Sequence, residues 1–400
     1  MVFLTKVSLR NYKSIAACQV ELGDLTFLVG PNGSGKSNFL DAIHFVADSL
    51  NTTLDHALRD RGTIKEVRRR SGGHPNHFAI RLEFQLPTGG RGHFSFRIGA
   101  KQNGGFEVQS EECRLIGTNG MLGEASYHVR GGQLVKTTAT VVPPVLTDRL
   151  FLVAVSGLPE FRPAYDALSR MAFYNLSPEK IRAMQKPDAG DLLDRDGGNS
   201  ASVFAKLSPK AQSEINGYLS RIVPGLAGAD PKTLGSQETL EFRQQVKGSK
   251  NPWRFLAGSM SDGTLRAFGV LLALFQTLER NGHAPKFVGL EEPEVALHPA
   301  AAGVLLDGLR QASAWTQVAV TSHSPDLLDH PNIPAESILA VESIDGVTQL
   351  GQLDEAGRTV LAQKLFTPGE LLRVNQLSPD RQALANLLDQ RQPNLFDFES

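Results

Sequence analysis

A glycine-rich stretch near the start of the chain has the residue types that surround bound phosphate groups in proteins. It fits the pattern G-x-x-x-x-G-K-[ST], extended by one asparagine: Gly30, Pro31, Asn32, Gly33, Ser34, Gly35, Lys36, Ser37 and Asn38. Its glycines would let backbone N–H groups turn toward an anion, and the helix expected next would add its positive N-terminal end. In this pattern the lysine reaches the β- and γ-phosphates of a nucleotide, and the serine hydroxyl is a Mg²⁺ ligand. We therefore expect residues 30–38 to bind the phosphates of a nucleoside triphosphate.

A second group of candidate residues follows two apolar runs in the C-terminal half. Glu291 and Glu292 come directly after residues 287–290, and His323 follows the run 317–320 closely. Beside a phosphate-binding loop, Glu291 would hold Mg²⁺ through its water shell, and Glu292 would polarise the attacking water. His323 would sense the γ-phosphate, although a single histidine is usually structural and two acids can simply begin a helix. The assignments are as follows: catalytic Lys36, Glu292 and His323, and metal-binding Ser37 and Glu291.

A third candidate is the start of an apolar helix predicted for residues 265–278. Ser261 and Gly263 stand directly before it, where the free N–H groups of a helix start would face an anion. A Ser-Asp-Gly sequence is also an ordinary helix cap. We expect Ser261 and Gly263 to contribute to nucleotide binding.

Hydrophobic patterning indicates which elements position these residues. The apolar run 25–29 predicts a strand before the glycine-rich stretch, and residues 38–50 predict a helix with one apolar face. Short alternating runs separated by glycine turns predict antiparallel hairpins over residues 78–142. Other segments are less regular: a mostly helical one at 148–223, a loop at 224–236, a strand at 240–246 and a polar helical tail at 346–400.

Charge and composition limit the classes of function. The 400 residues carry a net charge of -1, so any contact with nucleic acid must come from a local patch. Arg68, Arg69 and Arg70 form one basic run, which is either a solvated face or a contact for the DNA phosphate backbone. No apolar run approaches the ~18 residues of a membrane span. Because the first ten residues are no signal peptide and the two cysteines suit a reducing compartment, we expect a cytoplasmic protein without membrane contact.

Five motifs, taken in order, resemble one family. They are Asn11-Tyr12-Lys13-Ser14, the stretch 30–38, Met260-Ser261-Asp262-Gly263-Thr264, the run 290–299 and Thr321-Ser322-His323-Ser324-Pro325. The series is similar to the ABC-type ATPase heads of the SMC/RecF/OLD class, and most similar to stand-alone bacterial ATPases of the AAA_21 type. The resemblance covers most of residues 1–345 and is weak in the hairpins and the tail.

The resemblance implies an α/β fold, namely an ABC ATPase head with a P-loop mixed sheet, an antiparallel β subdomain and a helical insertion. Four segments would follow: an N-terminal ATPase lobe (1–147), the helical insertion (148–250), a C-terminal ATPase lobe (251–345) and a helical tail (346–400). It also implies ATP and Mg²⁺ as cofactors. The protein would form a homodimer or higher oligomer in which the P-loop of one subunit faces Ser261 and Gly263 of another.

Three departures from the ABC pattern bear on these expectations. Glu291 stands where aspartate is usual, and its extra methylene still permits contact through water. The signature reads Met-Ser-Asp-Gly-Thr in place of Leu-Ser-Gly-Gly-Gln, which argues against a transporter. No glutamine clearly fills the Q-loop position, and Gln85, at the end of a predicted strand, is the best candidate.

The resemblance favours an ATP-gated dimeric switch in DNA transactions, in anti-phage defence or repair, acting with a separate nuclease or TOPRIM-like effector. Two alternatives are a transport ATPase subunit and a non-hydrolysing, nucleotide-dependent scaffold. The intact Lys36, Ser37, Glu292 and His323 argue against the scaffold. A GTPase is disfavoured because the sequence has no N-K-x-D motif.

The end of the chain offers one further motif. Residues 392–396 resemble the Q-x-x-L-F peptides that dock on bacterial sliding clamps, with Leu395 and Phe396 as apolar anchors. The alternative is that these side chains fold back onto the protein and cover apolar surface. Short motifs often match by chance, so the sequence favours the alternative.

Overall fold

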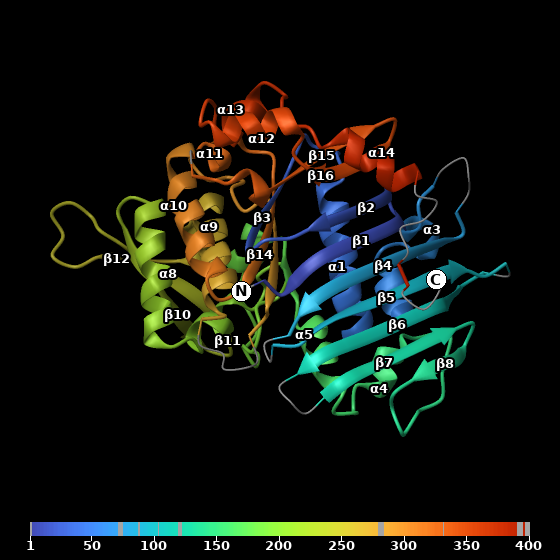
Figure 1. Ribbon diagram of the computed structural model, residues 1–400. Coiled ribbons are helices and arrows are strands. Elements are labelled where there is room, and N and C mark those ends of the chain that lie inside the picture. The colour runs from blue at the N-terminus through green and yellow to red at the C-terminus, as the bar shows by residue number, and fades with distance from the viewer. Residues whose placement is uncertain are drawn as a thin grey trace. The chain divides into compact units, whose positions relative to one another are not determined.

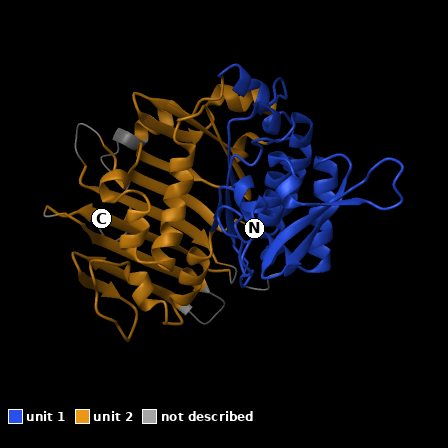
Figure 2. Ribbon diagram, turned by 180° about the vertical axis from the view of Figure 1, so that it is seen from behind, with its two compact units in different colours: residues 1, 172–333, 363–375 blue, residues 2–171, 334–362, 376–400 orange. Residues whose placement is uncertain are grey.

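The computed structural model describes residues 2–70, 75–86, 89–102, 104–118, 122–278, 284–330, 332–389 and 395–396. These residues form two compact units, which Figure 2 colours separately. Unit 1 contains the described parts of 172–333 and 363–375, and unit 2 those of 2–171, 334–362 and 376–400. Each unit gathers segments from distant parts of the sequence. The four segments proposed from the sequence divide the chain differently and remain a proposal.

Unit 2 is built on a mixed sheet with the strand order β8-β7-β6-β5-β4-β1-β2-β16-β15-β3 (Figure 1). The strands are β1 (Leu4–Tyr12), β2 (Ile15–Glu21), β3 (Leu25–Val29), β4 (His77–Gln85), β5 (Arg91–Ala100), β6 (Phe106–Thr118), β7 (Leu122–Arg130), β8 (Gln133–Thr137), β15 (Ile338–Ile344) and β16 (Val347–Gln352). The pairs β2–β16 and β15–β3 are parallel, and the other neighbours are antiparallel. The mixed sheet and the antiparallel hairpins expected from the sequence are therefore confirmed.

One face of this sheet is covered by α1 (Lys36–Asn51), which begins within the last residues of the glycine-rich stretch. Phe45 of α1 packs edge-on against Phe78 of β4, with ring centroids 5.5 Å apart, and against Phe96 of β5 at 6.2 Å. The apolar face predicted for this helix is buried. The remaining helices of unit 2 are α2 (Leu54–Arg59), α3 (Ile64–Val67), α4 (Phe151–Val155), α5 (Arg162–Ser169), α12 (Glu355–Ala362) and α14 (Arg381–Asp389).

Unit 1 combines parallel strands with a bundle of helices. Strands β9 (Ala172–Tyr174) and β14 (Gln317–Ser322) both pair in parallel with β13 (Phe287–Glu291). Its helices are α6 (Pro178–Arg182), α7 (Ser200–Ala205), α8 (Pro209–Ile222), α9 (Asp262–Phe275), α10 (Ala302–Ser313), α11 (Pro325–Leu328) and α13 (Pro368–Arg373). Because α9 is apolar on every side, it is buried from Thr264 onward.

Two expectations about secondary structure are wrong. Residues 224–236 are not a loop, because β10 (Leu226–Leu234) pairs with β11 (Gln237–Gln244), which pairs with β12 (Trp253–Leu256). Pro231 fits there since β10 is at the edge of this small sheet. The segment 346–400 is not wholly helical, because it begins with β16. Both strands carry turn-forming residues and depend on a partner strand rather than on local pattern.

Residues 395–396 pack on strands β4 and β5 of unit 2. Leu395 and Phe396 are buried beside Ala79 of β4. The Arg97 guanidinium lies over the Phe396 ring at 5.0 Å, and Arg81 Nη1 donates a hydrogen bond to the Leu395 carbonyl at 3.2 Å. These contacts agree with the folded-back alternative. Residues 392–394 of the clamp-like motif lie outside the described residues.

Replacing Phe396 with alanine should destabilise the protein by about 3 kcal/mol, because a buried phenyl ring loses its contacts and leaves a cavity. The unfolding midpoint in urea measures this. Val135→Ala is the control, since that side chain is 62% exposed and its loss should change little. Equal midpoints for Phe396→Ala and the wild-type protein would show that the tail adds no stability.

Candidate functional site

The glycine-rich stretch forms the expected turn between a strand and a helix. It leaves the end of β3 and enters α1, and Gly33 and Gly35 adopt φ values of +74° and +103°. Such left-handed conformations favour glycine, and they let the loop curl around its own N–H groups. The Asn38 amide donates to the Gly35 carbonyl at 3.0 Å, and the N-terminus of α1 directs the N–H groups before it toward the loop. The loop therefore presents backbone donors to an anion.

Strands β15 and β16 contact this loop too closely to allow side chains at two of its glycines. A Cβ atom on Gly30 would lie 1.9 Å from the Val341 carbonyl oxygen, and one on Gly35 would lie 2.0 Å from Thr348 Oγ1. Non-bonded atoms do not approach so closely, so any larger residue would displace the loop or the strands. The glycines are thus required for packing as well as for their backbone conformation.

A chain of hydroxyl groups fixes the loop to the β1–β2 turn and to β16. Thr348 Oγ1 donates to the Ser34 carbonyl at 2.8 Å and lies 2.7 Å from Ser14 Oγ. Asn38 Nδ2 donates to the same Ser14 hydroxyl at 2.7 Å. Sequence reasoning missed Thr348, because one threonine in a strand carries no recognisable signal. Ser14 was found only through the resemblance of residues 11–14.

The functional side chains of the loop are arranged for a bound phosphate. Lys36 is buried, and its Nζ donates to the carbonyls of Gly30 at 2.8 Å and Pro31 at 2.9 Å. The Ser34 hydroxyl is buried and has no hydrogen-bond partner among the described residues. The Ser37 side chain is exposed at the start of α1. A buried cation, an unpaired hydroxyl and an accessible serine fit the triphosphate and Mg²⁺ of a nucleotide.

A buried ionic network ties the β1–β2 turn to α1. Asp41 Oδ2 accepts from the Tyr12 hydroxyl at 2.7 Å and is 2.6 Å from Lys13 Nζ, while Asp41 Oδ1 accepts from Arg61 Nε at 2.8 Å. Burial alone would raise the pKa of Asp41, but Arg61 and Lys13 outweigh it and lower that pKa. The carboxylate is therefore charged at neutral pH, and the turn at residues 11–14 stays beside the P-loop.

In unit 1 the two predicted catalytic side chains are in contact. Glu292 Oε1 lies 3.2 Å from His323 Nδ1, and the Glu292 amide donates to the Thr321 carbonyl at 3.0 Å. Parallel strands β13 and β14 end side by side, which places both residues at one edge. Glu292 has a φ of +44°, a left-handed conformation that is uncommon outside glycine. An acid and a histidine in this arrangement can activate a water molecule.

Two arginines that sequence reasoning missed neutralise acids of the candidate site. Arg195 Nη2 forms an ion pair with Glu291 Oε1 at 2.9 Å. Arg182 pairs with Asp262 and donates to the Met260 carbonyl at 3.1 Å. The second pair removes the negative charge that Asp262 adds to the start of α9. No motif marked either arginine.

The start of α9 has the geometry of a helix cap. The Ser261 hydroxyl accepts from the Thr264 amide at 3.3 Å and is exposed, as the sequence predicted for a cap. Gly263 packs against the loop after β13, because a Cβ there would lie 2.3 Å from the Ala296 carbonyl oxygen. Ser261 is therefore exposed, and Gly263 is held against the loop after β13. Their role in nucleotide binding remains a prediction.

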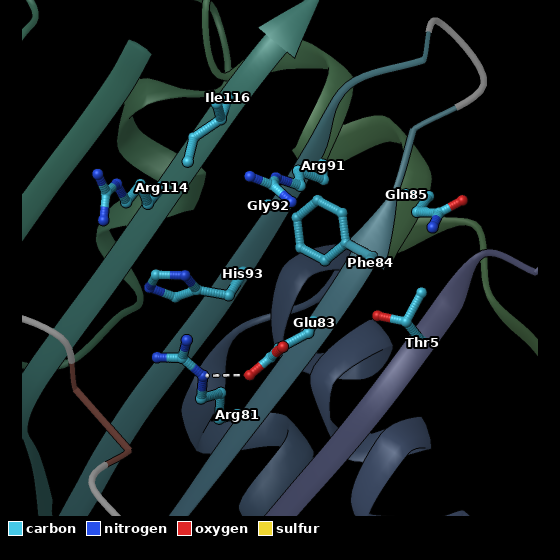
Figure 3. Close-up of a pocket in the computed structure, with 10 residues that line it drawn as sticks. All are labelled: Thr5, Arg81, Glu83, Phe84, Gln85, Arg91, Gly92, His93, Arg114 and Ile116. Carbon is cyan, nitrogen blue, oxygen red and sulfur yellow. Dashed lines mark hydrogen bonds and ion pairs between the residues drawn. The ribbon is translucent and has the colours of Figure 1, made fainter. Parts of the chain in front are cut away.

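The expectation for Gln85 is wrong. Strand β3 runs parallel to β15, and successive pairings through β16, β2 and β1 make β4 run opposite to β3. The C-terminal end of β4 therefore lies at the opposite end of the strands from the P-loop. Gln85 instead lines a cavity of about 420 Å³ over β4, β5 and β6 (Figure 3).

This cavity is basic in composition and is partly neutralised by neighbouring acids. Its charged lining includes Arg81, which pairs with Glu83 at 3.1 Å, and Arg114, which pairs with Glu124 at 2.8 Å. His93 Nε2 lies 2.5 Å from Glu112 Oε1 of β6. Two of the three arginines that line the cavity are therefore paired with acids, and the third is Arg91.

The basic run at residues 68–70 lies beside the β1–β2 turn. The Arg69 amide donates to the Asn11 carbonyl at 2.7 Å, and Arg68 Nη1 donates to the Pro75 carbonyl at 2.6 Å. Arg70 forms an ion pair with Glu66. Two of the three side chains thus have structural partners, while the DNA contact stays a prediction.

Replacing Thr348 with valine should weaken ATP binding about tenfold, because the Ser34 carbonyl and Ser14 hydroxyl lose a buried partner at constant side-chain shape. Isothermal titration calorimetry measures the dissociation constant. Thr348→Ser keeps the hydroxyl and should bind ATP within about twofold of wild type. Equal affinities for the valine and serine variants would mean that the hydroxyl does not support the loop.

Comparison with known proteins places the chain in a family. Residues 3–346 match the RecF/RecN/SMC N terminal domain. Structural maintenance of chromosomes protein 1 of Arabidopsis thaliana is 28% identical over 181 residues, which are 41% of this chain and 14% of that protein. The chromosome partition protein Smc of Methanocaldococcus jannaschii is 43% identical over 65 residues, 16% of this chain and 6% of that protein. The chain thus matches only a small part of these relatives.

Solved structures show the same fold. An Smc head bound to the C-winged helix domain of ScpA matches with a TM-score of 0.53 and 15% identity, covering 89% of this chain and 99% of that one. An Smc head domain with an extended coiled coil, bound to the C-terminal domain of ScpA derived from Pyrococcus furiosus, matches with a TM-score of 0.54 and 13% identity, covering 91% and 100%. With its α/β mixed sheet, P-loop and Glu292–His323 pair, the chain belongs to the RecF/RecN/SMC N-terminal domain family and has the fold of SMC-head ABC ATPases.

Proposed function

We propose that this protein binds and hydrolyses ATP and acts as an ATP-gated dimeric switch in DNA transactions. The observation that carries the proposal is the Glu292–His323 contact at the ends of β13 and β14, in a chain that also holds a complete P-loop. A loop alone would bind nucleotide. An acid held against a histidine adds the means to activate water.

Different residues of the chain would bind the phosphates, hold the metal ion and accept the proton of the attacking water. Lys36 and the amides at the start of α1 would bind the phosphates, and the exposed Ser37 hydroxyl and Glu291 would hold Mg²⁺. The bound metal ion would neutralise charge that develops on the phosphates. Glu292 would accept the proton of the attacking water. His323 would orient that carboxylate, to which it already lies at 3.2 Å.

The accessible start of α9 supports the proposed dimer. Ser261 and Gly263 would contact the γ-phosphate of ATP held by the P-loop of a second subunit, so each site would need both subunits. This arrangement makes ATP binding assemble the dimer and hydrolysis release it. A role in repair or anti-phage defence, with a nuclease or TOPRIM-like effector, fits stand-alone ATPases of the AAA_21 type and a cytoplasmic location.

DNA is the proposed substrate of the switch because the relatives by name act on chromosomes. The basic run at 68–70 would contribute to its contact, as it lies beside the turn at residues 11–14. Among the described residues, no helix is both long and apolar enough to span a bilayer. The departure from the Leu-Ser-Gly-Gly-Gln signature favours the switch over a transport ATPase subunit.

Glu292→Gln should bind ATP within about twofold of wild type but hydrolyse it at least 100-fold more slowly, because the amide cannot accept a proton. Light scattering should then show a dimer that persists in ATP. Lys36→Ala is the control that loses nucleotide binding and therefore also the dimer. A wild-type protein that binds ATP and releases no phosphate would favour the scaffold alternative instead.

Ser261→Arg should bind ATP but neither dimerise nor hydrolyse it, because the larger side chain blocks the partner's phosphate. Mixing Ser261→Arg with Glu292→Gln subunits should restore part of the phosphate release, since one of the two shared sites is then intact. A mixture as inactive as its components would contradict the shared site and leave ATP binding by single subunits untouched.

A further inference from the structure

One buried arginine in unit 1 holds the backbone from which the candidate catalytic acids project. Arg266 lies in the second turn of α9 and is 9% exposed. Its Nη2 donates to the carbonyls of Glu291 at 3.1 Å and Glu292 at 2.9 Å, and its Nη1 donates to the Leu176 carbonyl at 2.7 Å. A single guanidinium therefore binds the backbone carbonyls of both acids at the end of β13 and links them to the segment after β9.

The hydrogen bonds from Arg266 support the backbone at a residue with an unfavourable conformation. The φ of +44° at Glu292 is unfavourable for a residue with a side chain, and such conformations persist only when the surroundings impose them. On one side the Glu292 amide is bonded to β14 through Thr321. On the other side its carbonyl is bonded to Arg266. The direction of the Glu292 carboxylate toward His323 thus depends on both bonds.

The same arginine is close to the start of α9. Ser261 caps the helix, and Gly263 lies so near the loop after β13 that an added Cβ would be 2.3 Å from the Ala296 carbonyl oxygen. Ala296 itself has a φ of +65°. The first two turns of α9 therefore contact the residues after β13 at two points, Gly263 and Arg266. A shift of the helix start must move this loop or break these contacts.

We propose that Arg266 is a positioning residue for Glu292, and that it couples the Glu292 carboxylate to whatever binds at the start of α9. This inference rests on the proposed dimer, in which the start of α9 contacts the nucleotide of the partner subunit. Binding there would set the position of Glu292 within the same subunit. Each ATP site would then report its occupancy to the other through a single side chain.

The chemistry of the contact requires arginine rather than any cation. Three carbonyls accept from two guanidinium nitrogens, and the planar fork presents its donors in fixed directions. An ammonium group is a point charge and could not reach all three carbonyls from one position. Burial lowers the pKa of Arg266, and Glu294, Glu292 and Glu291 partly offset that effect. The acids beyond the carbonyls thus help to keep the guanidinium charged in a buried place.

Steady-state ATP hydrolysis by Arg266→Gln and Arg266→Lys tests the proposal. We expect kcat to fall about tenfold or more for glutamine and less for lysine, with the ATP dissociation constant within about twofold of wild type. The Hill coefficient for ATP should be above 1 in the wild type and fall to 1 in both variants. Arg221→Gln is the matched control, because among the described residues that exposed arginine of α8 pairs only with Asp307 and Tyr218, and its kinetics should be unchanged.

A double mutant separates positioning from general support of the fold. If Arg266 acts through Glu292, then Arg266→Gln in a Glu292→Gln background should hydrolyse ATP no more slowly than Glu292→Gln alone. Losses that multiply would overturn the proposal, as would a wild-type kcat in Arg266→Lys and Arg266→Gln. A wild-type Hill coefficient of 1 would overturn the coupling.

The outcomes also distinguish this inference from the proposed function. Absence of hydrolysis in the wild-type protein would reject the ATPase itself. Normal hydrolysis together with unchanged kinetics in the Arg266 variants would reject only the role of Arg266. If Arg266→Gln fails to fold, as judged by its unfolding midpoint, the kcat, affinity and Hill coefficient of Arg266→Lys decide the matter.

Discussion

The fold of unit 2 around the P-loop depends on the close approach of that loop to β15 and β16. Gly30 and Gly35 lie against the Val341 carbonyl and the Thr348 hydroxyl with no space for a side chain. These strands come from the far end of the chain, so the loop takes its shape only when both ends of the sequence have folded together. The motif glycines therefore satisfy two constraints at once, a left-handed backbone at Gly35 and a contact that only glycine permits.

In both units, side chains donate hydrogen bonds to the backbone carbonyls of the candidate site. In unit 2, Lys36 and Thr348 donate to carbonyls of the P-loop. In unit 1, Arg266 donates to the carbonyls of Glu291 and Glu292. Thr348 and Arg266 thus bind the backbone, whereas Lys36 is itself a candidate functional side chain. Hydrogen bonds from charged donors are stronger than neutral ones, which suits positions that must not shift.

The sequence predicted those parts that carry a local pattern. The P-loop, the hairpins and the strands before Glu291 and His323 follow from spacing and periodicity, and the structure confirms these elements. Thr348 and Arg266 could not be found in this way, since each is an ordinary residue whose importance comes from a distant partner. Strands β10 and β16 were missed for the same reason, because their turn-forming residues are stabilised by pairing. Gln85 was placed wrongly because strand direction depends on sheet order, which the sequence does not reveal.

The two arginines after β9 explain how unusual acids are accommodated. Glu291 and Asp262 both depart from the ABC pattern, and each is paired with an arginine from the segment 178–199, Arg195 and Arg182 respectively. Exposed ion pairs contribute only about 0–1 kcal/mol, so these contacts hold the acids without fixing them.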